Sequence, residues 1–178
     1  MSLEELLDFW KEVRAGLIAE LAQIPAEQFA FQPAPESRSV AGIIRHIVGA
    51  QEVSTGELCR PDTDFKRLPM RELVEKDAAE SYSGGDKEEL IGLLRSSMES
   101  VEAALRAFGE EALREKVQGP NGKMISKLSF LYLYITHEMY HRGQLTVYER
   151  LMQIEPAATA KVRELLAAMG VARPQRED

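Results

Sequence analysis

The segment FLYLYITHEMYHRGQLTVYERL, residues 130–151, determines the fold that the sequence predicts. Apolar and aromatic residues recur in it with a helical period, so we expect one long helix from about Ser126 to Ile154. His137 and His141 are four residues apart, which places their rings one turn apart on the same side, facing the core. The inward stripe is predicted to comprise Phe130, Leu133, Tyr134, His137, His141, Gln144, Tyr148, Leu151 and Met152.

Three further amphipathic segments of helical length precede this one, and each begins with a capping signal. In the first and third segments, a serine or aspartate is followed three residues later by glutamate, as in a capping box. In the second segment, either of two serines can cap the helix. The expected limits are Ser2 to about Ile24, Ser37 or Ser39 to about Cys59, and Asp86 to Gly109.

Four long amphipathic helices predict an all-α fold, a four-helix bundle. In residues 60–85 the helical pattern weakens, with Pro61, Pro69 and Gly84–Gly85 around a short polar helical piece near 71–79, so the segment is expected to form a long crossover between the second and third helices. Strands have little room in this pattern. Pro156 should open a short extra C-terminal helix at about 156–169, closed by Gly170. We expect a single domain over residues 1–178, with the bundle core at about 3–153.

Composition and charge exclude several classes of partner. The 22 basic and 29 acidic residues give a net charge of −7, and the basic residues are scattered, so no nucleic-acid partner is expected. The acidic start and the lack of a long apolar run indicate a cytoplasmic protein without a membrane partner. The single cysteine, Cys59, lacks a partner for a disulfide or a paired metal motif, and we assign it no chemical role.

The histidines point to a metal site. The chain has only three, and His46 shares the inward sector of the second helix with Ile43 and Ile47. Burying three imidazoles would cost about 1–3 kcal/mol for each unpaired polar nitrogen, whereas one divalent ion satisfies all three. We therefore predict that His46, His137 and His141 are metal ligands. Three neutral ligands leave the ion charged and open to water or substrate, which is typical of catalytic zinc or nickel.

Other polar residues on the inward faces are candidates for the same pocket. Gln144 and Tyr148 lie one and two turns beyond His141, and Ser97 lies opposite on the third helix, although packing is the favoured role for each. Arg14 falls within the apolar stripe of the first helix. It can bind an anion in the pocket, but extension to the surface or an ion pair with a glutamate is the favoured interpretation. Arg142 is expected to brace a neighbouring helix.

Residues 137–141 also read HExxH, the signature of zinc peptidases in which the glutamate, here Glu138, is the general base. The match is short. The longer peptidase pattern requires glycine and histidine where this chain has Gln144 and Val147, and no acidic residue stands at the spacing that the glutamate-ligand variant requires. A zinc peptidase is therefore a minor alternative, and Glu138 is not retained as a catalytic candidate.

Two segments together resemble a known family. They are SVAGIIRHI at residues 39–47 and HEMYHRGQL at residues 137–145, and they are similar to the DinB-like superfamily of four-helix-bundle metalloenzymes. The resemblance covers roughly residues 3–153. It implies metal ligands at His46, His137 and His141, a long crossover, and homodimers, which are frequent in the family. The chain departs from the family pattern at Arg45, where an aromatic residue often precedes the histidine, and at Gln51, where an acidic residue often follows.

The resemblance implies a range of activities, which includes S-transferases and isomerases that use low-molecular-weight thiols, and metal-dependent hydrolases. We expect an enzyme in which the ion activates a small thiol or water for attack on a small-molecule electrophile. The alternative from another class is a non-enzymatic, metal-stabilised helical protein that acts in interaction or stress. A pocket that reaches the histidines favours the enzyme, and a sealed site favours the alternative.

Overall fold

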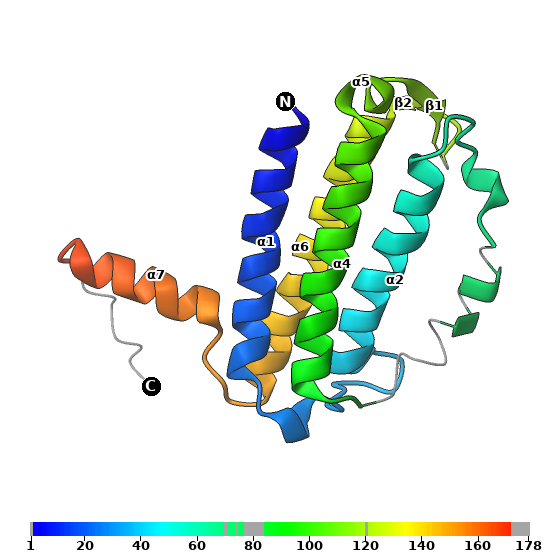
Figure 1. Ribbon diagram of the computed structural model, residues 1–178. Coiled ribbons are helices and arrows are strands. Elements are labelled where there is room, and N and C mark those ends of the chain that lie inside the picture. Colours follow the sequence, from blue (N-terminus) through cyan, green and yellow to red (C-terminus); the bar gives the residue numbers. More distant parts are fainter. Residues whose placement is uncertain (1, 70, 74, 77–83, 120, 172–178) are drawn as a thin grey trace.

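The computed structural model describes residues 2–69, 71–73, 75–76, 84–119 and 121–171, and it confirms the four-helix bundle (Figure 1). Within these ranges, every helix is too short or too polar to cross a membrane. The long helices are α1 (Leu3–Gln23), α2 (Val40–Leu58), α4 (Lys87–Phe108) and α6 (Lys127–Leu151). The shorter elements are η1 (Ala26–Gln28), η2 (Phe65–Arg67), α5 (Glu110–Leu113), β1 (Lys116–Gln118), β2 (Met124–Ser126) and α7 (Ala157–Ala168).

The predicted caps are present at the helix ends. Ser2 and Glu5 form the capping box of α1, and the Asp86 carboxylate accepts a hydrogen bond from the backbone N–H of Glu89 at 2.8 Å. Ser39, not Ser37, caps α2, because its Oγ accepts from the Gly42 N–H at 2.9 Å. Each of the four long helices therefore begins where a side chain satisfies a backbone donor that the helix itself leaves unpaired.

The long helices form a ring in which α1 neighbours α6 and α4, and α2 neighbours the same two helices. Figure 1 shows that α2 and α4 run in the same direction, opposite to α1 and α6. Because neighbouring parallel helices cannot be joined by a tight turn, the chain returns along the bundle between them, as the sequence predicts. The crossover contains η2 and helical residues at 71–73 and 75–76; the rest of the expected helical piece, residue 74 and residues 77–79, lies outside the described residues.

A small antiparallel sheet departs from the expectation that strands have little room. Strands β1 and β2 pair through Val117 and Ile125, and the turn between them includes Gly122 at a φ of 78°. Glycine suits this left-handed conformation because it has no Cβ. Each strand has three residues, too few for an alternating pattern to stand out in the sequence.

The buried face of α6 is rotated relative to the predicted stripe and shares only part of it. The stripe residues that are buried are Phe130, Tyr134, His141 and Tyr148. Leu133 and Leu151, which were placed on the inward stripe, are 49% and 58% exposed, so that part of the prediction is wrong. The centre of the buried face is instead occupied by Glu138, which has no exposed surface. The sequence pattern misplaces the face because a glutamate reads as an outward residue unless its charge is compensated inside the protein.

Arg14 compensates that charge. Its Nε lies 2.6 Å from Glu138 Oε1 and its Nη2 lies 3.0 Å from Oε2, so the ion pair is bidentate. Glu138 Oε2 also accepts from Trp10 Nε1 and Gln51 Nε2, each at 2.8 Å. Arg14 in turn donates to Gln51 Oε1 and to Ser97 Oγ, at 2.6 Å and 3.1 Å. The favoured interpretation of Arg14, an ion pair with a glutamate, matches this structure.

This polar layer takes one member from each long helix: Arg14, Gln51, Ser97 and Glu138. It separates two apolar clusters. On α1, for example, Val13 belongs to one cluster and Leu17 to the other, with Arg14 between them. All four members are buried, and the charges are satisfied by one another, by the Trp10 indole and by the Leu94 carbonyl.

A second buried charge cluster joins α1, α6 and the start of α7. The Glu20 carboxylate accepts from Arg142 Nη2 at 2.8 Å and from the Ala158 N–H at 3.3 Å, so Arg142 does brace a neighbouring helix. Glu149 is also fully buried, and among the described residues neither of its oxygens has a hydrogen-bond partner. Burial and the nearby Glu20 raise the pKa of Glu149 to about 8, although Arg150 and Arg142 oppose the shift.

Replacing Glu138 with glutamine should destabilise the protein by about 3–5 kcal/mol, because it leaves the Arg14 guanidinium buried without a counter-charge. The double variant Arg14→Met/Glu138→Leu should recover most of that loss. Urea unfolding of the single and double variants measures both quantities. The control is Lys11→Met, which removes a partly exposed ion pair between α1 and α4 and should cost no more than about 1 kcal/mol. Equal effects of Glu138→Gln and Lys11→Met would contradict the role of the layer.

The raised pKa of Glu149 predicts a pH-dependent stability. The folded state holds this proton more tightly than the unfolded state, whose carboxyl has a pKa near 4.5, so the contribution is full below that value and is lost as pH rises to about 8. Glu149→Gln should therefore be more stable than the natural protein at pH 9, with the difference vanishing near pH 5. Thermal unfolding across this range tests it, with the exposed Glu164→Gln as a control that should track the natural protein.

Candidate metal centre

Three imidazoles converge between α2 and α6. His137 Nε2 lies 3.0 Å from His46 Nε2 and 3.0 Å from His141 Nε2, and all three nitrogens lie within 4.8 Å of one another. Nitrogens bound at about 2.0–2.1 Å to a tetrahedral ion are roughly 3.3 Å apart. Two of the three nitrogen pairs are near this spacing, so the donor set fits one divalent ion.

The environment of His141 prepares its ring to donate a lone pair. Burial, chiefly, lowers its pKa to about 4, and the nearby charges of Arg38 and the other two histidines act in the same direction. Its Nδ1 lies 2.7 Å from Gln144 Oε1, which can only accept, so Nδ1 carries the proton. The unprotonated Nε2 then faces the other imidazoles. This is the arrangement in which a neighbouring group fixes the tautomer of a metal-binding histidine.

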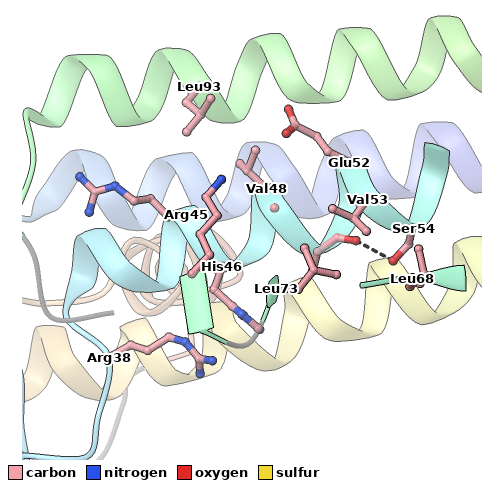
Figure 2. Close-up of a pocket in the computed structure, with 13 residues that line it drawn as sticks. Arg38, Arg45, His46, Val48, Glu52, Val53, Ser54, Leu68, Leu73 and Leu93 are labelled. Atoms are coloured by element: carbon pink, nitrogen blue, oxygen red, sulfur yellow. Dashed lines mark hydrogen bonds between the residues drawn. The ribbon is translucent and has the colours of Figure 1, made fainter. Parts of the chain in front are cut away.

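The cluster is open on one side. His141 is buried, but His46 and His137 are only half-buried. A cavity of about 670 Å³ reaches His46 and lies along α2, between α4 and the crossover (Figure 2). The residues that line it are Arg38, Arg45, His46, Val48, Gly49, Ala50, Glu52, Val53, Ser54, Leu68, Leu73, Lys76 and Leu93. A small molecule in this cavity would meet the histidine cluster at His46.

Glu138 belongs to the structure of the bundle, although it sits between two of the histidines in sequence. Its carboxylate is directed to Arg14, Trp10 and Gln51 and is fully buried. A general base must reach the water that it deprotonates. The HExxH string in this chain therefore provides two histidines for the cluster and one glutamate for the polar layer.

The three pocket candidates from the sequence have different surroundings. Gln144 contacts the cluster through His141, and its Nε2 donates to the Tyr140 hydroxyl at 3.1 Å. Ser97 is in the polar layer, where its hydroxyl accepts from Arg14. Tyr148 is packed against Phe31, and its hydroxyl donates to the Arg38 carbonyl at 3.0 Å. Only Gln144 of the three is placed to influence the histidines directly.

Sequence reasoning did not identify the cationic wall of the cavity. Arg38 precedes the cap of α2 and Lys76 lies on the crossover, so neither belongs to a periodic helix face. The sequence did contain one signal of this wall: Arg45 precedes His46 at a position where the family often has an aromatic residue. Cys59, at the end of α2, is half-buried, and burial raises the pKa of its thiol, which agrees with its having no assigned chemistry.

Solved structures with a similar fold have low sequence identity to this chain. The mycothiol-dependent maleylpyruvate isomerase has a TM-score of 0.66 and 18% identity over 82% of this chain, which spans 61% of the isomerase. YfiT from Bacillus subtilis, described as a probable metal-dependent hydrolase with an unusual four-helix bundle topology, has a TM-score of 0.70 and 17% identity over 87% of this chain and 91% of its own.

A DinB-like protein from Bacillus cereus ATCC 10987 has a TM-score of 0.64 and 19% identity, and the match covers 87% of this chain and 95% of that protein. At these identities the likeness establishes the fold alone. Among curated proteins, no sequence matches the chain. The sequence does match the family model of the DinB superfamily over residues 9–145, a range that holds α2, α4, most of α1, and α6 as far as the end of the histidine motif. The chain therefore belongs to the DinB superfamily.

Proposed function

We propose that the chain is a metal-dependent enzyme whose divalent ion is held by His46, His137 and His141. The observation that carries the proposal is the convergence of three imidazole Nε2 atoms beside a cavity that reaches one of them. Imidazole ligands suit zinc and nickel, and these are the ions that we propose. Three neutral ligands leave coordination positions for water or substrate.

The proposed reaction is attack by a small thiol or by water on a small-molecule electrophile. When bound, the ion would lower the pKa of a coordinated thiol or water. Gln144 would hold the His141 ring in the tautomer that ligates, and the cavity would hold the substrate beside His46. The thiol-dependent isomerase supports the thiol version, and YfiT, as a probable hydrolase, supports the water version.

Two alternatives have less support. A non-enzymatic, metal-stabilised bundle would be favoured by a sealed site, whereas the cavity beside His46 favours an enzyme. A zinc peptidase would require Glu138 as a base, and this carboxylate is buried against Arg14. The proposal therefore retains the histidines of the HExxH string and excludes its glutamate from catalysis.

The metal site is tested with protein purified without a polyhistidine tag. We expect about one zinc or nickel ion per chain by elemental analysis, and a higher melting temperature when the ion is added to metal-free protein. His141→Ala should abolish stoichiometric binding. Gln144→Ala should keep the site but weaken affinity about 10–100-fold, because it removes the hydrogen bond to Nδ1. Met139→Ala, between the histidines but exposed, is the control and should bind as the natural protein does. Metal content that His141→Ala leaves unchanged would rule out this ligand set.

The nucleophile is tested by incubating metal-loaded protein with a panel of small electrophiles, with and without a low-molecular-weight thiol. A thiol transferase should form S-adducts, detected by mass spectrometry, only when the thiol is present. A hydrolase should turn over without it. His141→Ala should be inactive in both assays, and turnover that survives this substitution would show that the reaction does not use the proposed site.

A further inference from the structure

The cavity beside His46 carries a charge opposite to that of the whole chain. Among its lining residues, Arg38, Arg45 and Lys76 are cationic and Glu52 is the one carboxylate, whereas the chain has a net charge of −7. Cations gathered in a concave site focus a positive potential there, even when the rest of the surface is acidic. The cavity should therefore attract anions.

The charges are distributed unevenly along the cavity. Figure 2 shows Arg38 and Arg45 on one side of the view, with His46 between them, and Glu52 with Ser54 and Leu68 on the other side. Arg38, Arg45 and His46 all line the cavity, so both guanidinium groups share this end with a member of the histidine cluster. The positive end of the cavity is thus the end where the proposed metal would lie.

The fold holds the backbone of Arg38 and the guanidinium of Arg45 in position. Arg38 directly precedes Ser39, the cap of α2, and its carbonyl accepts from the Tyr148 hydroxyl of α6 at 3.0 Å. Arg45 Nη2 donates to the Gly84 carbonyl at 2.9 Å, which joins α2 to the end of the crossover. Positioned guanidinium groups match the planar geometry of carboxylate and phosphate oxygens better than a lysine ammonium does.

The rest of the cavity is largely apolar. Its walls include Val48 and Val53 of α2, Leu93 of α4, and Leu68 and Leu73 of the crossover. A volume of about 670 Å³ is within the range of small-molecule sites, which are typically about 300–1,000 Å³ and combine apolar walls with a few polar groups that fix orientation. A ligand that fits would have an apolar body and one charged end.

We propose that this cavity binds small organic anions, with the carboxylate or phosphate held between Arg38 and Arg45 beside His46 and an apolar body along α2 and the crossover. The inference deepens the proposed function, on which it rests for the role of the histidines, because it names the substrate class. A divalent ion held by neutral imidazoles would add positive charge at the same end of the cavity. Cationic small molecules are excluded by the same charges.

The test uses four six-carbon probes that differ in the head group: hexanoate, hexyl phosphate, hexanamide and hexylamine. Each is titrated by ligand-observed NMR into the protein as purified and after removal of metal by a chelator. In both forms, at least one of the two anions should bind about tenfold more tightly than hexylamine, and its binding should weaken as salt is added. Whichever of hexanoate and hexyl phosphate binds more tightly shows whether the cavity prefers a carboxylate or a phosphate.

Arg45→Gln and Arg38→Gln should each weaken anion binding about three- to tenfold and leave hexanamide binding unchanged, since only the charged contact is lost. The control is Lys161→Gln, which removes the same charge from exposed α7, outside the lining of the cavity, and should change nothing. Arg45→Gln decides the test if the Arg38 variant is unstable. Equal binding of hexylamine and both anions, or anion binding that Arg45→Gln does not alter, would overturn the inference. Anion binding is also measured in the metal-free form. If the chain bound no metal, this measurement would still decide whether the cavity binds anions.

Discussion

The buried ion pair between Arg14 and Glu138 sets how the helices of the bundle are turned toward one another. Apolar side chains pack in many similar arrangements, whereas a buried charge has few acceptable partners. Trp10, Gln51 and Ser97 complete the hydrogen bonds of the pair. Each of the helices α1, α2, α4 and α6 thus contributes a side chain to the layer, which fixes its position along the bundle axis. A shift of any helix would leave a charged or polar group unsatisfied in the core.

The same constraint directs the histidines. Glu138 is fixed at the centre of the buried face of α6. His137, next to it in sequence, and His141, about one turn later, therefore lie at the flank of that face, where His137 is half-buried and His141 is buried. Gln51 has a similar effect on α2, since it faces the layer while His46 faces the cavity. A cluster at the flank keeps the packing of the core and still leaves a side open to small molecules.

Local signals in the sequence predicted much of this structure. Capping side chains such as Ser2 and Asp86 mark helix starts because they act within one turn, and the four-residue spacing of His137 and His141 survives any rotation of the helix. What could not be predicted depends on contacts distant in sequence. The rotation of α6 follows from the pairing of Glu138 with Arg14, 124 residues away, and a short hairpin leaves too few residues to show a period.

The direction of the helices links the fold to the cavity. Because α2 and α4 are parallel neighbours, the chain between them must travel back along the bundle. Described residues of this crossover line the cavity that reaches His46. Leu68, Leu73 and Lys76 of this crossover form a wall opposite α2 that short loops between antiparallel helices would not supply. Under the proposed function, the bundle core would carry the rigidity and the crossover part of the recognition. Substitutions in the crossover would then change the ligand that the proposed site accepts without altering the polar layer or the histidine cluster, to which Leu68, Leu73 and Lys76 do not belong.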